Sequence, residues 1–201
     1  MQREHFGQRT VMITLGRVLV LAAVCLAPVF ALAPARASAG ASSSGNWRAR
    51  LNQELPLLGH RNWIAVVDSA YPLQTSGGIE TVETDADQLE VVQAVLGELG
   101  KAKHVRPVIF TDAELKLVPE SDAQGVTAYR EALAKLLGNS EAQSLPHEEI
   151  ISKLDEAGKT FHILVLKTRL TVPYTSVFIR LECGYWSADA EKRLRAAMAS
   201  H

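Results

Sequence analysis

The segment "WIAVV" at residues 63–67 places the strongest constraint on the fold. All five residues are apolar and three are β-branched. A strand with one face in water alternates apolar and polar residues, whereas a strand covered on both faces reads as a continuous apolar run. We therefore expect a buried strand here and three further strands in the apolar stretches 105–110, 161–166 and 176–182. Pro107 has no N–H to donate, so it must lie at a sheet edge or at the start of its strand.

Helical periodicity separates the expected strands. Apolar side chains recur at helical spacing, and most of these patterns begin or end at a capping residue. Asn46 is the expected N-cap of the first helix, which Gly59 would end; Asp85 with Gln88 forms a capping-box pattern, and Ser187 caps the last helix. The expected helices cover residues 47–58, 86–99, 126–137, 147–157 and 188–200. Strands that alternate with helices predict an α/β fold, a three-layer sandwich with a mostly parallel central sheet.

Residues 1–39 do not have the composition of a folded domain. Three arginines precede an apolar run at 18–33, and small residues with two Ala-x-Ala sites follow at 35–39. This order is typical of a secretory signal peptide, and the run is too short for a stable membrane span; the alternative is an uncleaved N-terminal anchor. We predict a signal peptide at 1–39, a flexible linker at 40–45 and a single domain with a C-terminal helical extension at 46–201, in a periplasmic or secreted protein.

Charge and cysteine content limit the partners of the mature chain. The full sequence has 21 basic and 22 acidic residues, and loss of residues 1–39 removes four bases and one acid, which leaves 17 and 21. The resulting net charge of −4 argues against nucleic acid as a partner. We expect no membrane contact after cleavage. Cys183 is then the remaining cysteine, so stability must come from the core rather than from a disulfide.

His60 and Asp68 flank the buried strand at 63–67 and are the first candidates for chemistry. Ligands of open α/β sheets bind beyond the carboxyl ends of the strands, which is where Asp68 is expected. The two side chains cannot meet along a straight strand. Each must reach a common ligand through loops or across a subunit boundary.

Four segments resemble, in order and spacing, the D-ribose pyranase and L-fucose mutarotase family (RbsD/FucU-like), small proteins that interconvert the cyclic forms of free sugars. The segments are "LGH" at 58–60 followed by Asp68 and Pro72, "VRPVIFTDAEL" at 105–115, "PHEEI" at 146–150 and "VPYTSVFIRLECG" at 172–184. The resemblance covers residues 50–185. It implies an RbsD-like fold, a free monosaccharide as partner and a homo-oligomer. Ring opening changes only the hemiacetal bond, so we expect no cofactor, and the spacing of the candidate residues requires no metal.

The resemblance also assigns roles to residues. His60 matches the histidine that acts as acid and base, and Asp68, His147 and Tyr174 match residues that line the sugar pocket. Ser176 stands where the family has an asparagine two positions after the tyrosine, and a hydroxyl lacks the paired donor and acceptor of an amide. This departure leaves the identity of the sugar open. A helix is also added beyond the usual end of the family.

Sugar ring opening is proton chemistry that suits these residue types. One proton leaves the anomeric hydroxyl while another reaches the ring oxygen, and ring closure reverses both transfers. A histidine titrates near neutrality and can do either. We therefore predict a mutarotase or pyranase with His60 as the catalytic residue and with Asp68, His147, Tyr174 and Ser176 as substrate-binding residues.

Other interpretations of these residues stay open. His60 can be a surface cation at a helix end, Asp68 an Asx-turn residue, His147 the start of a helix and Tyr174 ordinary core. His60, Asp68 and His147 could also form a two-histidine, one-carboxylate metal site, although their spacing does not require a metal. At the level of function, the alternative is an exported, non-catalytic monosaccharide-binding or structural module on the same fold.

Cleavage of the signal peptide is testable by mass. We expect the protein recovered from the exported fraction to begin after Ala37 or Ala39, because an Ala-x-Ala site precedes each of these bonds. Intact-mass spectrometry measures this start directly. A full-length chain recovered from the cytoplasm would contradict the prediction.

Overall fold

A six-stranded sheet organises the computed structural model, which describes residues 46–138 and 140–200. The predicted signal peptide and linker lie outside these residues. The strands are β1 Trp63–Val67, β2 Ile79–Glu83, β3 Val105–Asp112, β4 Gln143–Leu145, β5 Ile163–Lys167 and β6 Val177–Cys183. Their order is β2-β5-β1-β6-β3-β4; β6 runs antiparallel to β1 and β3, and the other pairings are parallel. The sheet is mostly parallel, as predicted.

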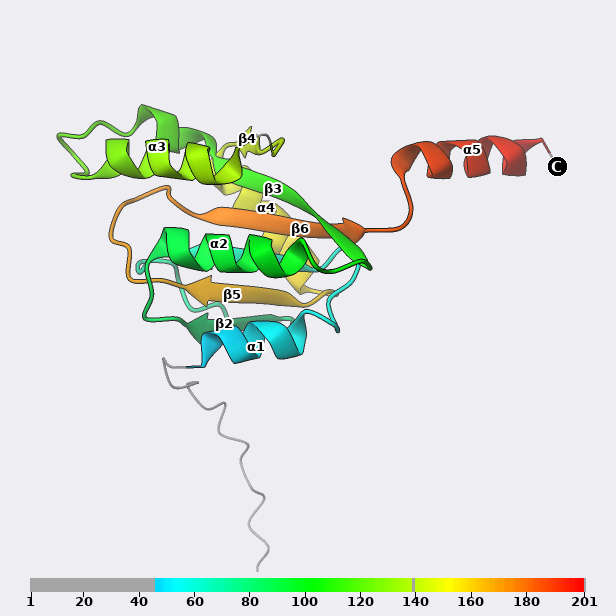
Figure 1. Ribbon diagram of the computed structural model, residues 1–201, viewed down its shortest axis with the longest axis horizontal. Helices are drawn as coiled ribbons and strands as arrows, with labels where there is room; N and C mark the ends of the chain where they lie inside the picture. Colours follow the sequence, from blue (N-terminus) through cyan, green and yellow to red (C-terminus); the bar gives the residue numbers. More distant parts are fainter. Residues whose placement is uncertain (1–45, 139, 201) are drawn as a thin grey trace, which may run out of the picture. The chain divides into compact units, whose positions relative to one another are not determined.

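Helices pack on both faces of this sheet (Figure 1). The helices of the chain are α1 Trp47–Glu54, α2 Gln88–Leu99, α3 Val126–Leu137, α4 His147–Gly158 and α5 Ala188–Ala199, with a short 3-10 helix, η1, at Ala113–Leu117. The first four pack on the sheet. Apolar side chains of α1, α2 and α3 form one core with the sheet, and those of α4 form a second core on the opposite face. The predicted three-layer α/β sandwich is confirmed.

β1 is buried along its whole length, and each of its residues is at most 3% exposed. Ile64 and Val66 enter the core that contains α1, α2 and α3, whereas Trp63, Ala65 and Val67 enter the core that contains α4. β5 and β6 lie on either side of it. An unpaired polar group in such surroundings costs free energy, and the five side chains of β1 are all apolar.

Two features of the sheet and its first helix differ from the sequence expectation. The first helix ends at Glu54 rather than at Gly59, because Pro56 has no N–H with which to continue the turn. The edge strands β2 and β4 were not predicted, since they are short and partly exposed and lack the apolar run that marks β1. Pro107 fits its prediction: β4 pairs with β3 only from Phe110 onward, so Pro107 lies on an open edge.

The predicted cap of α2 is also wrong. Asp87, not Asp85, is the N-cap, and its Oδ1 accepts hydrogen bonds from the backbone N–H of Leu89 at 2.9 Å and of Glu90 at 3.4 Å. Asp85 lies outside the helix with a φ of 48°. Gln88 is fully buried, so its amide is not available to a capping box.

The predicted C-terminal extension is α5, which follows β6. Its Ser187 cap is confirmed, because the Ser187 Oγ accepts from the backbone N–H of Ala190 at 3.1 Å. None of the residues of α5 is buried. Within the described part of the chain, no helix has both the length and the apolarity that a bilayer crossing requires.

A close backbone approach at Gly78 makes the start of β2 sensitive to substitution. A Cβ at this position would lie 2.3 Å from the Gly158 carbonyl oxygen at the end of α4, whereas a Cβ at Gly77 would meet nothing within 4 Å. We expect Gly78→Ala to lower the free energy of unfolding by about 1–3 kcal/mol, the usual cost of overpacking. Chemical denaturation of Gly78→Ala and of the matched control Gly77→Ala measures this cost. Equal stability of the two variants would contradict it.

Candidate functional site

A cavity of about 410 Å³ opens beyond the carboxyl end of β1, where ligands of such sheets bind. We call it the Tyr174 cavity. Residues 68–72 after β1, His147 at the start of α4, and residues 171–174 of the loop between β5 and β6 line it. The structure thus brings together three of the predicted site residues, Asp68, His147 and Tyr174.

His147 is bound to a buried carboxylate. Its Nδ1 lies 3.0 Å from Oδ1 of Asp112, the last residue of β3, whose side chain is 0% exposed. The backbone N–H of His147 donates to the Glu114 carboxylate at 3.0 and 3.1 Å, which fixes the start of α4. The imidazole itself is 29% exposed. Bonding through Nδ1 leaves Nε2 as the ring nitrogen that a ligand in the cavity can reach.

Burial raises the pKa of Asp112 to about 6, and the negative charges of Glu114 and Asp68 act in the same direction. The hydrogen bond and the charge of His147 oppose this rise. Among the described residues, Oδ2 of Asp112 has no hydrogen-bond partner, which adds to the cost of its ionised form. The Asp112 carboxyl therefore takes up a proton near pH 6, at the point where it bonds to the His147 imidazole.

Tyr174 is held in a conformation that an L-residue rarely adopts. Its φ is 58°, in the left-handed region, and its ring lies edge-on to the His147 imidazole with centroids 5.7 Å apart at 82°. The side chain remains accessible, with the residue 39% exposed. Backbone strain of this kind persists where the surrounding structure imposes it, and it is concentrated at functional sites.

The strain at Tyr174 is imposed by a buried polar network at the next residue. The carbonyl of Thr175 accepts from the Gln88 side-chain amide at 2.5 Å and from the Tyr129 hydroxyl at 2.6 Å. Thr168 donates to the Gln88 side-chain oxygen at 2.7 Å. Both ends of the loop that carries Tyr174 are thereby bonded to Gln88 of α2. Because these groups are buried, water does not compete for their hydrogen bonds, and the loop is held in position.

Asp68 takes part in a turn and also lines the cavity. Its Oδ1 accepts from the backbone N–H of Ala70 at 2.8 Å, the Asx turn that the sequence left open as an alternative. The turn directs the chain toward Tyr71, whose hydroxyl donates to Gln74 at 3.1 Å. Burial raises the pKa of Tyr71 to about 12, so this hydroxyl stays protonated.

His60 and Ser176 lie apart from the Tyr174 cavity. His60 is exposed at the amino end of β1, and five residues of strand span about 17 Å. It lines a different cavity, described below, so a single chain does not bring His60 to Asp68 or His147. Ser176 is 1% exposed and is not among the residues that line the Tyr174 cavity.

Asp112 is the site residue that the sequence interpretation missed. The signal was present, because Asp112 stands at the carboxyl end of β3 just as Asp68 follows the carboxyl end of β1. The two strands point the same way in the sheet, so their ends share one edge. An aspartate after a predicted strand is, however, also the ordinary start of a turn, and its pairing with His147 depends on β4 and α4 returning to β3.

One group of side chains has the residue types of a metal site. Ligand atoms of Glu54, Glu80 and His162 lie within 4.8 Å of one another. The Arg50 guanidinium donates to both oxygens of Glu80, at 2.7 and 2.6 Å, and pairs with Glu54 at 2.9 Å. Since a cation already occupies the space between the carboxylates, the arrangement is that of an ion-pair cluster.

No protein-family model matches the chain, and no curated protein matches it either. Twelve chains of solved structures do. RbsD from Bacillus subtilis, complexed with D-ribose, is 19% identical, with 67% of this chain and 92% of that chain covered and a TM-score of 0.48. FucU from Bifidobacterium longum is 13% identical, with 67% of this chain and 94% of that chain covered and a TM-score of 0.46. The fucose mutarotase from Streptococcus pneumoniae, complexed with L-fucose, is 16% identical, with 66% of this chain and 91% of that chain covered and a TM-score of 0.43.

The raised pKa of Asp112 predicts a pH-dependent stability. Aspartates of the unfolded chain titrate near pH 4, so between about pH 4 and pH 6 the folded state binds more protons. The stability that this group contributes is fully present below about pH 4 and is lost as the pH rises through about 6. The total loss of unfolding free energy is up to about 3 kcal/mol. The unfolding free energy of the wild type, minus that of Asp112→Asn, should therefore fall from pH 4 to pH 7.

Urea denaturation across this pH range measures the difference. Asp122→Asn, at an exposed aspartate, is the control and should give a much smaller change. A wild-type-minus-Asp112→Asn difference that is flat with pH would show that Asp112 titrates like a solvated carboxyl.

Proposed function

We propose that this protein interconverts the cyclic forms of a free monosaccharide by acid/base ring opening and closure, without a cofactor. The observation that carries the proposal is the Asp112–His147 pair at the Tyr174 cavity, because it supplies a proton-transfer group beside a polar and an aromatic wall. A cavity of about 410 Å³ has room for one such sugar. The motif resemblance described above points to the same chemistry.

In the proposed mechanism His147 is the base of ring opening. The ionised Asp112 carboxylate accepts the Nδ1–H, so Nε2 carries the lone pair and takes the proton of the anomeric hydroxyl. The bond between the anomeric carbon and the ring oxygen breaks, its electron pair stays on the ring oxygen, and a second group protonates that oxygen. Rotation of the open chain and the reverse transfers close the ring in its other form. Asp68 accepts hydrogen bonds from neighbouring hydroxyls.

His60 is the proposed second group, acting from another copy of the chain. His147 does not line the cavity of His60, but the exposed position of His60 at the amino end of β1 makes it accessible to a neighbouring subunit. In a homo-oligomer, His60 of one copy enters the Tyr174 cavity of the next and delivers the proton to the ring oxygen. The site is incomplete without this second copy.

The second candidate function is an exported, non-catalytic monosaccharide-binding module. Burial of Ser176 favours it, because this side chain does not reach the cavity to hold the substrate. The engagement of one Asp68 oxygen in the Asx turn favours it too. Export to a periplasmic or secreted location is proposed for both functions, and it rests on the signal-peptide pattern at residues 1–39.

Anomer exchange measured by saturation-transfer NMR on D-ribose and L-fucose tests the proposal. The wild type should exchange anomers faster than buffer, and His147→Ala should lower the catalysed rate about 10²–10⁴-fold, the usual contribution of acid/base help. The rate should also fall as the pH drops through about 6, where Asp112 takes up a proton.

Glu148→Gln is the matched control, since Glu148 is the exposed neighbour of His147 on α4 and does not line the cavity. Its rate should equal that of the wild type. A wild-type protein that binds a sugar and leaves its exchange at the buffer rate would replace the proposed enzyme with the binding module.

A further inference from the structure

A second cavity, of about 580 Å³, lies at the amino end of β1 and is distinct from the Tyr174 cavity. We call it the His60 cavity. His60 and Arg61 form one wall, the ends of β3 and β6 form another, and residues 185–188 with Glu191 and Arg195 of α5 form the third. The C-terminal extension therefore borders the residue that the proposed function makes an acid.

The extension brings two exposed aromatic residues to this cavity. Tyr185 is 80% exposed and Trp186 is 44% exposed. The indole N–H of Trp186 donates to Glu191 at 2.8 Å, and Arg195 donates to the other oxygen of Glu191 at 2.6 Å. This chain of bonds orders the Trp186 ring against the first turns of α5.

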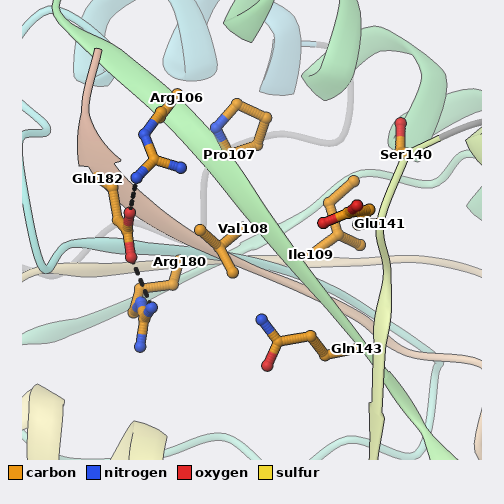
Figure 2. Close-up of a pocket in the computed structure, with 9 residues that line it drawn as sticks. All are labelled: Arg106, Pro107, Val108, Ile109, Ser140, Glu141, Gln143, Arg180 and Glu182. Carbon is orange, nitrogen blue, oxygen red and sulfur yellow. Dashed lines mark hydrogen bonds and ion pairs between the residues drawn. The ribbon is translucent and has the colours of Figure 1, made fainter. Parts of the chain in front are cut away.

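Polar side chains outside α5 also line this cavity, and they differ in whether they are already paired. Glu182 pairs with both Arg106 and Arg180, as Figure 2 shows, so these two guanidinium groups are already engaged. Arg61 has no ion pair among the described residues and lies over the Phe161 ring at 5.7 Å. His60 is exposed beside it.

Arg61 also carries backbone strain. Its φ of 77° places it in the left-handed region, like Tyr174 in the other cavity. The backbone N–H of Arg61 donates to the Leu181 carbonyl at 2.9 Å, which holds this conformation against β6. Of the three non-glycine residues with positive φ in the described ranges, one lines each cavity. Strain at both fits a functional use of both.

We propose that Tyr185 and Trp186 of the C-terminal extension contact the sugar on which His60 acts, and so help to select it. The C–H face of a sugar ring packs against aromatic rings, while its hydroxyls bond to planar donors such as the Arg61 guanidinium. This inference rests on the proposed function, in which His60 of one copy reaches the sugar in the Tyr174 cavity of the next copy. Tyr185 and Trp186 line the same cavity as His60 and approach that sugar with it. The extension is then part of the binding site and acts on substrate choice.

Trp186 offers a direct readout, because the other two tryptophans, Trp47 and Trp63, are buried. Addition of D-ribose or L-fucose to the full chain should change the fluorescence of the wild type, and Trp186→Phe should abolish most of that change. Trp186→Ala should weaken binding of the same sugar about tenfold, as expected for loss of one aromatic contact. Trp186→Phe keeps a ring and should bind nearly as the wild type does.

Leu194→Ala is the matched control, because Leu194 is exposed on the same helix and does not line the cavity. Its sugar affinity should be unchanged. Unaltered sugar affinity in Trp186→Ala would overturn the inference. If Trp186→Ala also formed a smaller assembly in light scattering while its affinity per site was unaltered, the extension would be a subunit contact instead. A wrong proposed function would give a different result. The wild type would bind sugar without exchanging its anomers, and Trp186→Ala would still bind the sugar more weakly.

Discussion

Every side chain of β1 packs against apolar neighbours, on one face of the sheet or the other, and each is at most 3% exposed. A charged group placed among them would cost several kcal/mol of free energy unless it were paired. The helices on both faces follow from this constraint, since a single layer would leave half of the strand in water. Chemistry is thereby confined to the strand ends, with His60 at one and Asp68 at the other.

The Asp112–His147 pair shows what such an end permits. Asp112 ends β3 at the same edge of the sheet as Asp68, deep enough that burial raises its pKa to about 6. The imidazole, 29% exposed, connects that buried carboxyl to the cavity. Burial opposes ionisation of the Asp112 carboxyl, and in the proposed reaction the same ionised carboxyl holds the His147 imidazole in place by its hydrogen bond. Stability and function are linked through the same hydrogen bond.

The apolar runs were sufficient to predict the layers, because β1 and β5 allow no other environment. Edge strands β2 and β4 were missed, since a short half-exposed strand has no run or alternation to detect. Gln88 was misread as part of a capping box, because its actual partner, the Thr175 carbonyl, is 87 residues away. Asp112 was missed for the same reason. Local patterns identify which residues end a strand, while long-range pairing decides which of them meet.

The central claim is that the two ends of β1 act together only between copies of the chain. Mixing His60→Ala with His147→Ala, after unfolding and joint refolding, tests it most directly. Each variant alone should be inactive in anomer exchange, while mixed assemblies should regain activity, because some of their cavities combine an intact His60 with an intact His147. Mass spectrometry of the intact assembly verifies the mixing. No activity in verified mixed assemblies would contradict the account.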